Sequence, residues 1–540
     1  MRLKALLFYL FLCGLWPSAA AAHHRFIVRD TAGLAALQQA CATLGCTVVR
    51  SIDDGGLNQV FLVTAPLEID AAVVLAELLN IPGVVNAEQD QAIALVTGLN
   101  QTGTVPAGLS DTSSVQYFGA SVQNGYVNQP AAQIVRVSEA QNTFHVAGTG
   151  IVADIDTGVD PNHPVLQGVL LPGWDFTRDQ PGGSEMTDLQ PPFTSPSPCA
   201  ECPAAVVNQS TAAVLDQSTA AVLDGNPQYA AFGHGTMVMG VIHMVAPQAQ
   251  LLPLKAFQSD GTGRLSDILS AIYFAVRNQA NVINMSFDLK TNSHELSKAL
   301  DYANKQNVIC SASVGNDGAM EIVYPAAVQS DVMGVASTSD LDQRSTFSNF
   351  GDAIVWVAAP GEAIISTYPF GSYGAAWGTS FSAPFVAGAA ALLLDQRPST
   401  NESQAAAAVA HATPIGPDMG NGRLDLVQAL AANAGQQSDF CIFEAHHHRK
   451  VKIHPGHNKR AAFFFDVKAL QGFTGTVDLS VAGLPSSVSA DLNPPAITGS
   501  GKFVLTLRAD DEAQPGSYQL TVTGTSGGLL HSVDIDLRVE

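Results

Sequence analysis

The chain has 540 residues, of which 46% are hydrophobic, and its formal net charge is −22. This length predicts more than one domain, and the apolar content suffices for a sizeable core. The excess of acidic residues argues against nucleic acids and anionic membranes as partners, because both bind basic surfaces.

Residues 1–22 have the pattern of a secretory signal peptide. Arg2 and Lys4 precede an apolar run at 6–16, and three alanines at 20–22 fit the cleavage pattern. The run is too short for a stable membrane anchor, and no later stretch is long and apolar enough to span a bilayer. The protein is therefore expected to be secreted, to the extracellular space or the periplasm, with no membrane anchor.

Residues 23–96 alternate strand and helix patterns in the order β-α-β-β-α-β, which predicts a small ferredoxin-like α+β domain. Cys41 and Cys46 lie close together in this segment, as do Cys199 and Cys202 farther along. In an oxidising compartment each pair could form a disulfide. Residues 97–125 are rich in polar and small residues without periodicity, which indicates an exposed, cleavable linker.

Residues 126–435 alternate short apolar strands with helical patterns, which predicts an α/β domain with a largely parallel sheet. Inside it, residues 209–224 contain the sequence "QSTAAVLD" twice. We interpret this repeat as a surface helix, and the alternative is a rim element over a cleft.

The end of the chain has a different composition. Residues 436–450 are expected to form a linker, and the histidines at 446–448 are interpreted as a solvated tract rather than a metal site. From 451 to 540 the apolar residues recur with period two between turn clusters. This pattern predicts an all-β sandwich of immunoglobulin-like type.

Three separate segments hold the residue types of a nucleophilic serine site. Asp156 ends the apolar strand of "IVADIDTGVD", His234 lies between glycines in "FGHGTMVMGVI", and Ser380 lies in "GTSFSAPFVAG" before an apolar helix. A serine hydroxyl needs a base to take its proton and a carboxylate to orient that base. The chain order Asp, His, Ser is not that of chymotrypsin or of the α/β-hydrolases.

A fourth segment, "SASVGNDG", supplies a hydrogen-bond donor. Asn316 follows an apolar strand in a glycine-flanked loop. Its side-chain amide and the backbone N–H of Ser380 are suited to stabilise the oxyanion that forms when a carbonyl is attacked. Asp154 is interpreted as structural, because the sequence identifies no partner for it.

With these motifs in place, residues 126–432 resemble the catalytic domain of the subtilisin-like serine proteases, the subtilases. The likeness extends to "DPNHPVL", "NVINMSF", "STFSNFG" and "VAAPG". It implies that Ser380 is the nucleophile, His234 the general base, Asp156 the carboxylate and Asn316 the side chain of the oxyanion hole. Residues 23–96 look like the inhibitor-type propeptide of this family, and residues 451–540 look like immunoglobulin-like domains attached to secreted bacterial proteases.

The resemblance implies a secreted serine endopeptidase, made as a self-processing zymogen, that hydrolyses peptide bonds of protein or peptide substrates. Its own propeptide would act as an intramolecular inhibitor, and the protein is expected to be a monomer. No cofactor is required for this chemistry. Calcium is a common structural ion in the family, but the sequence assigns no ligands to it, and no other metal is expected.

The resemblance also assigns a substrate-binding wall, formed by Ser286, Phe287, Asp288, Leu289 and Gly315. The family usually has two glycines where this chain has Asp288 and Leu289. An inward Asp288 would favour Lys or Arg at P1, the substrate residue before the cleaved bond, since a poorly solvated charge needs a partner. An inward Leu289 would instead favour small P1 residues, and both alternatives stay open at this point.

Two other functions compete with this interpretation. The acid-acting sedolisins also have a Gly-Thr-Ser nucleophile, but they pair it with Glu and Asp, and the intact "HGT" at His234 argues against them. The second alternative is a non-catalytic adhesion protein whose working part is the β-sandwich. The presence of all four chemical positions argues against that alternative.

Overall fold

The computed structural model describes residues 23–53, 57–95, 105–189, 205–209, 211–214, 227–435, 439–444, 451–453, 460–470, 473–527 and 529–539. The expected signal peptide, the Cys199–Cys202 pair and the histidines at 446–448 lie outside these ranges. The chain divides into two compact units, Met1–Asp90 and Gln91–Glu540. None of the helices in the described ranges combines the length and apolar character needed to cross a membrane.

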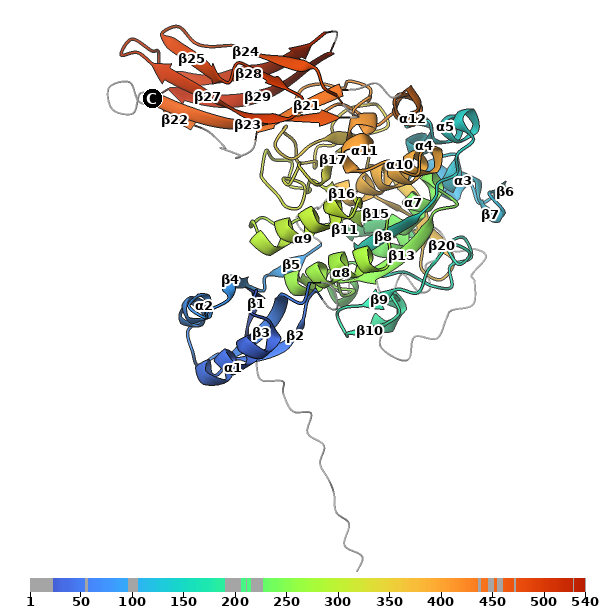
Figure 1. Ribbon diagram of the computed structural model, residues 1–540. Coiled ribbons are helices and arrows are strands. Elements are labelled where there is room, and N and C mark those ends of the chain that lie inside the picture. Colours follow the sequence, from blue (N-terminus) through green and yellow to red (C-terminus); the bar gives the residue numbers. More distant parts are fainter. Residues whose placement is uncertain are drawn as a thin grey trace, which may run out of the picture. The chain divides into compact units, whose positions relative to one another are not determined.

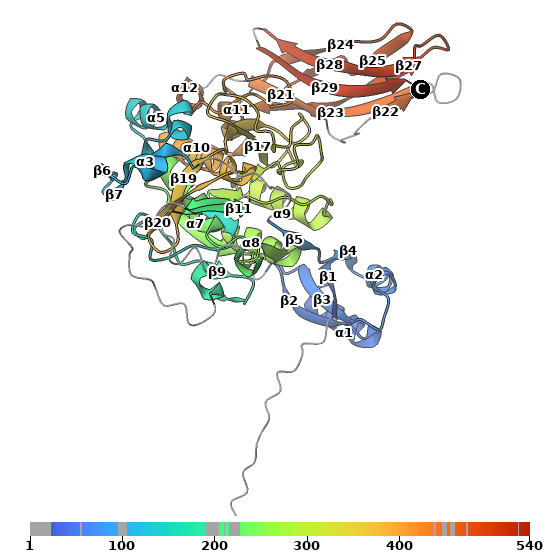
Figure 2. The same cartoon turned by 180° about the vertical axis from the view of Figure 1, so that it is seen from behind.

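The first unit is a four-stranded antiparallel sheet with two helices (Figure 2). Its elements are β1 (His23–Asp30), α1 (Leu34–Leu44), β2 (Thr47–Ser51), β3 (Val60–Pro66), α2 (Ala71–Leu79) and β4 (Val84–Gln89), in the sheet order β2-β3-β1-β4. Alternate strand residues such as Phe26 and Phe61 pack with Leu37 and Leu78 of the helices. A disulfide joins Cys41 and Cys46 at the end of α1.

The second unit is built on an eight-stranded sheet in the order β10-β9-β13-β8-β15-β16-β17-β18. The strands are β8 (Ile151–Asp156), β9 (Trp174–Asp175), β10 (Gln180–Pro181), β13 (Gln250–Lys255), β15 (Val282–Met285), β16 (Ile309–Ser313), β17 (Met333–Thr338) and β18 (Val357–Pro360). All neighbours from β9 to β18 are parallel. The prediction of a largely parallel sheet is confirmed, and the strands read as continuous apolar runs because both faces are covered.

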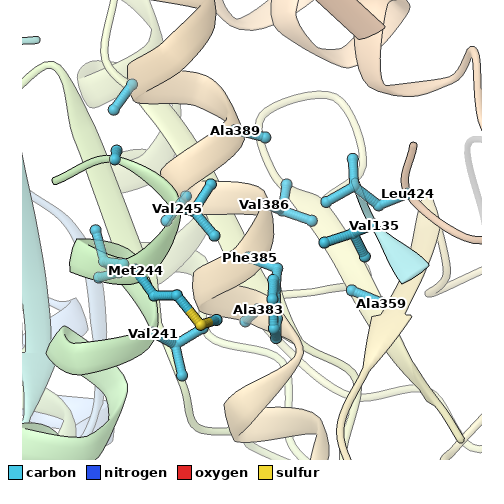
Figure 3. Close-up of a cluster of buried hydrophobic side chains, with 14 of the residues drawn as sticks. Val135, Val241, Met244, Val245, Ala359, Ala383, Phe385, Val386, Ala389 and Leu424 are labelled. Carbon is cyan, nitrogen blue, oxygen red and sulfur yellow. The ribbon is translucent and has the colours of Figure 1, made fainter. Parts of the chain in front are cut away.

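Two pairs of helices cover this sheet (Figure 1). In one pair α7 (His234–Val245) packs on α10 (Ala383–Gln396), and in the other α8 (Leu265–Arg277) packs on α9 (His294–Lys305). Figure 3 shows apolar side chains of α7, such as Val245, on one side of α10, and Val135 and Leu424 on its other side. A Cβ atom on Gly388 would lie 2.6 Å from the side chain of Val245, so glycine is what lets the two helices approach this closely. The pair positions the two chain segments that bear His234 and Ser380.

Residues 105–125 are not the linker that the sequence predicts. They form η1 (Ala107–Ser110), β6 (Ser114–Tyr117) and β7 (Ala120–Gln123), and α3 (Asn124–Val127) follows. Leu109 and Val122 are buried in the main core, and the hydroxyl of Tyr126 donates to the carbonyl of Gly240. A few large apolar side chains suffice to anchor this otherwise polar segment. The expected linker before residue 105 lies outside the described residues.

The remaining elements of the second unit complete this fold. They are β5 (Ala92–Ala94), α4 (Pro130–Ile134), α5 (Val137–Phe144), η2 (Glu185–Asp188), β11 (Ala205–Gln209), β12 (Thr211–Val214), η3 (Pro227–Tyr229), β14 (Thr262–Arg264), β19 (Ile364–Tyr368), β20 (Ser372–Ala376), η4 (Thr379–Phe381), α11 (Glu402–Val409) and α12 (Leu426–Gly435). Residues 211–214, near the start of the repeat, form a strand and not the expected helix, because β12 pairs with β20.

Two further sheets lie in the C-terminal part. They contain β21 (Asp439–Glu444), β22 (Val451–Ile453), β23 (Arg460–Leu470), β24 (Thr476–Ala482), β25 (Val488–Asn493), β26 (Ala496–Thr498), β27 (Gly501–Ala509), β28 (Gly516–Ser526) and β29 (Leu529–Val539). The orders are β21-β23-β27-β25 and β22-β29-β28-β24-β26, and both sheets contribute to one apolar cluster. Because residues 439–444 pair with β23, they are part of a sheet and not of the expected linker at 436–450.

Candidate active site

Asp156 is the last residue of β8, at the carboxyl end of the parallel sheet, where α/β folds place their sites. Its side chain is fully buried. One carboxylate oxygen, Oδ1, accepts a hydrogen bond of 2.6 Å from the backbone N–H of Thr157. The strand end therefore holds this carboxylate in a fixed orientation.

His234 is the first residue of α7, and its ring lies on Asp156. Nδ1 is 2.8 Å from both carboxylate oxygens, so the ring donates its Nδ1 proton to Asp156 and leaves Nε2 as the basic nitrogen. A Cβ atom on Gly235 would lie 2.0 Å from the carbonyl oxygen of Gly158. Glycine after the histidine is thus required for the helix start to reach the end of β8.

Ser380 lies in η4, directly before α10. Its hydroxyl donates to the carbonyl of Ser286 (3.1 Å), and the Ser286 hydroxyl donates in return to the carbonyl of Ser380 (2.8 Å). The ring of the next residue, Phe381, has its centroid 5.3 Å from that of His234. This ring contact brings the segment of Ser380 close to the histidine, but the Ser380 hydroxyl is bonded to Ser286 and has to change partner before His234 can take its proton. Ser382, the other serine of the motif, donates to the carbonyl of Pro360 and has a structural role.

Asn316 follows β16 and faces the same turn. Its Oδ1 accepts from the backbone N–H of Thr379 (2.9 Å) and from the Thr379 hydroxyl (3.0 Å). These two bonds orient the amide so that Nδ2 is the end available to an incoming oxygen. The donor and the nucleophile are therefore held together through Thr379, the residue before Ser380.

The five residues assigned to substrate binding lie on two segments beside this centre. Phe287 and Leu289 are buried, and Leu289 exchanges backbone hydrogen bonds with Tyr324 (2.7 and 2.8 Å). Asp288 has the opposite orientation, as alternate residues of an extended segment do. A Cβ atom on Gly315 would lie 3.4 Å from Cγ of Asp288, so the carboxylate faces the segment that bears Asn316. Burial is the largest cause that raises the pKa of Asp288 to about 6, and the charge of Asp317 adds to it.

Asp154 has a partner that the sequence does not reveal. Asn284 on the neighbouring strand β15 donates to Asp154 Oδ1 (2.9 Å) and also to the hydroxyl of Ser286 (2.9 Å). Burial and the nearby charge of Asp156 raise the pKa of Asp154 well above its ordinary value. This chain of contacts runs from β8 through Asn284 to Ser286, whose hydroxyl holds the carbonyl of Ser380.

Two further buried residues with ionisable side chains, Glu185 and Lys255, lie next to Asp156 and His234. Sequence patterns give no sign of either residue. Glu185 of η2 accepts from the backbone N–H of Gly233 (2.7 Å) and contacts the hydroxyls of Thr157 and Thr236. Burial raises the pKa of Glu185 to about 8, although Thr236 and Gly233 donate to it. Lys255 of β13 donates to the carbonyl of Thr157 and to Asp188, both at 2.8 Å.

A metal site is not found in the described ranges: no group of three or more His, Cys, Asp or Glu side chains there is arranged to hold an ion.

Comparisons with known proteins match part of the second unit. The model of the subtilase family of peptidases matches residues 148–440. Thermitase of Thermoactinomyces vulgaris is 33% identical over 274 residues, which cover 50% of this chain and 84% of thermitase. Subtilisin E of Bacillus subtilis is 38% identical over 192 residues, 33% of this chain and 50% of that protein. The crystal structure of a lanthipeptide protease aligns with 22% identity and a TM-score of 0.43, over 55% of this chain and 93% of that one.

Proposed function

Because this chain belongs to the subtilase family of serine endopeptidases, we propose that it is exported as an inactive precursor and hydrolyses peptide bonds with Ser380, His234 and Asp156. The observation that carries the proposal is the hydrogen bond of His234 to both oxygens of Asp156, beside the fixed backbone of Ser380. Subtilases need no cofactor for this reaction. Incubation with a mixed peptide library and mass-spectrometric identification of the products tests the proposal, which fails if no peptide is cut.

The proposed reaction starts with a proton transfer. His234 Nε2 takes the hydroxyl proton of Ser380 while Oγ attacks the carbonyl carbon of the substrate. Asp156 stabilises the imidazolium that forms, because it already accepts the Nδ1 proton. The negative oxygen of the tetrahedral intermediate is stabilised by Asn316 Nδ2 and the backbone N–H of Ser380. His234 then protonates the leaving amine, and water releases the acyl group by the same steps.

The segment just before residue 96 supports the proposal of a self-processing precursor. Strand β5 pairs antiparallel with β14, and the N–H of Leu95 donates to the carbonyl of Gly261 (2.9 Å). Ile93 and Leu95 are buried and Ala92 and Ala94 exposed, so the segment lies as an extended peptide bound to a strand edge.

Packed side chains connect the edge strand β14 with the segment that binds the Ser380 hydroxyl. Gly263 of β14 lies against Phe257, since a Cβ atom there would be 2.6 Å from that ring. The rings of Phe257 and Phe287 are 5.3 Å apart, and Phe287 follows the residue whose carbonyl binds the Ser380 hydroxyl. We therefore expect the first cleavage soon after Leu95, before the folded segment that starts at residue 105.

For substrate preference, the contacts support the inward Asp288 and not the inward Leu289. Leu289 is buried and paired with Tyr324, whereas Asp288 faces Gly315 beside the oxyanion donor. Lys290 pairs with Asp317 (3.1 Å) and Glu321 (3.3 Å), and its charge only partly offsets the burial that raises the pKa of Asp288. We propose that this wall favours Lys or Arg at P1.

The preference for basic P1 residues should depend on pH and on Asp288. Asp288→Asn is expected to lower the ratio of kcat/KM for P1-Lys over P1-Ala peptides roughly tenfold or more, since hydrogen bonds to charged groups contribute about 1.5–3 kcal/mol. In the unchanged protein the ratio should fall as the pH drops through about 6, because the carboxylate with its raised pKa then takes up a proton. The ratio cancels any effect of pH on the steps that both peptides share.

Matched peptides that differ only at P1 measure this preference, with Asp301→Asn on α9 as a control that removes an equal charge elsewhere. The assignment of Asp288 fails if the ratio is the same in Asp288→Asn and the unchanged protein. A selective rise for P1-Phe in Asp288→Gly would show that the side chain only occludes the pocket.

A further inference from the structure

We propose that Glu185 is a positioning residue that fixes His234 relative to Asp156 through three hydrogen bonds that meet on one buried carboxyl group. The inference rests on the proposed roles of His234 and Asp156. It concerns a part of the chain between these two residues, around Glu185, to which the sequence motifs assign no role.

The contacts of Glu185 reach both members of the pair. Oε2 accepts from the N–H of Gly233, the residue before His234 (2.7 Å). The same oxygen accepts from the hydroxyl of Thr157, the residue after Asp156 (3.2 Å), and Oε1 accepts from the hydroxyl of Thr236. Thr157 in turn accepts from the N–H of Gly235 (3.0 Å). One fully buried side chain thus bridges the end of β8 and the start of α7.

Glu185 and Thr157 together bind the start of α7. The first N–H groups of a helix have no partner within the helix, and a side chain at the N-cap usually accepts one of them. Here the N-cap is Gly233, which has no side chain and a φ of 88°. The hydroxyl of Thr157 accepts the N–H of Gly235, the second residue of the helix, and Glu185 accepts the N–H of Gly233 itself. Because both acceptors come from other segments, they fix the position of the helix start.

Glu185 is itself held in place by its own short helical turn. Asp188, the last residue of η2, binds Lys255 (2.8 Å) and Arg178. Lys255 also donates to the carbonyl of Thr157 (2.8 Å), so the turn is tied to β13 and to the end of β8. The carboxyl group therefore cannot follow His234 if the helix shifts, which is the property that a positioning residue needs.

We expect the length of the Glu185 side chain to matter more for the catalytic rate than its charge does. The charged groups that face Glu185 are Asp154 and Asp156 from β8 and Lys255 from β13. Burial raises the pKa of Glu185 to about 8, so the side chain carries little negative charge at neutral pH. A glutamine has the same length and keeps the oxygen that binds Gly233 and Thr157. An aspartate keeps the carboxyl group but is one methylene shorter.

The test compares Glu185→Asp with Glu185→Gln in the full chain, with Thr187→Ala, an exposed position of the same turn, as the control. Active sites are counted by titration with a fluorophosphonate, and kcat per titrated site is measured on one peptide. Glu185→Asp is expected to lower kcat roughly 10- to 100-fold, because displacement of catalytic groups by about 1 Å costs up to 10²-fold. Glu185→Gln should stay within about threefold of the unchanged protein, with KM similar in all variants.

A second measurement reports on the hydrogen bond between His234 and Asp156. The proton between His234 Nδ1 and Asp156 should give a downfield ¹H resonance that is kept in Glu185→Gln and is shifted or broadened in Glu185→Asp. Equal kcat values and equal resonances in both variants would overturn the inference, and a larger loss in Glu185→Gln would show that charge acts instead of reach. Absence of titratable sites in the unchanged protein would contradict the proposed function and not the role of Glu185.

Discussion

Ser380→Ala is expected to abolish peptide cleavage, with a loss of kcat on the order of 10⁶-fold, because no other group can form the acyl intermediate. The same variant should accumulate as an exported precursor in a host that lacks other proteases, with residues 23–95 still attached. Ser382→Ala is the matched control, since its hydroxyl only donates to the carbonyl of Pro360. Gel mobility, peptide activity and N-terminal sequencing of the three proteins give the answer.

The sequencing also tests where the precursor is cut. The unchanged protein should begin after Leu95 and before the folded segment at 105, since Leu109 is buried in the main core and its removal would expose that core. Normal maturation of Ser380→Ala would exclude self-processing. A start beyond Val122 would exclude the proposed presentation of the bond by β5.

Asn316→Ala should lower kcat roughly 10²- to 10³-fold with little change in KM, because the amide donates mainly to the oxyanion of the transition state. The variant also removes the acceptor of the Thr379 N–H and hydroxyl, so titration of active sites is needed to show that Ser380 is still in place. Asn278→Ala, directly after α8, provides the matched control, since its amide donates to the carbonyl of Phe274 (2.8 Å). Steady-state kinetics on one peptide series measure the effect, and an unchanged kcat would remove Asn316 from the oxyanion hole.

The strands and helices with a regular pattern of apolar residues could be predicted from the sequence. The apolar runs at β8, β15 and β16 predict buried parallel strands, and the residues that follow them are brought to one edge of the sheet by that topology alone. This is why Asp156 and Asn316 could be assigned from their place after a strand. His234 and Ser380 could be assigned because each starts or precedes an apolar helix.

The parts that depend on single contacts could not be predicted. Glu185 lies in a segment without periodicity, and only the packing of its turn brings the carboxyl group to Gly233. The partner of Asp154 is Asn284 on a neighbouring strand. No local sequence pattern pairs two residues that lie so far apart in the chain. Residues 105–125 read as a linker because their composition is polar, while the few side chains that anchor them, such as Leu109, are too sparse to form a pattern.

The central claim is that Ser380, activated by His234, attacks the substrate. The most direct measurement is reaction of the processed protein with a fluorophosphonate, followed by mass-spectrometric mapping of the labelled peptide. We expect one label per molecule, on Ser380, and no label in His234→Ala or in Ser380→Ala. Folded, processed protein that takes up no label, or that is labelled on another residue, would show that Ser380 is not the nucleophile.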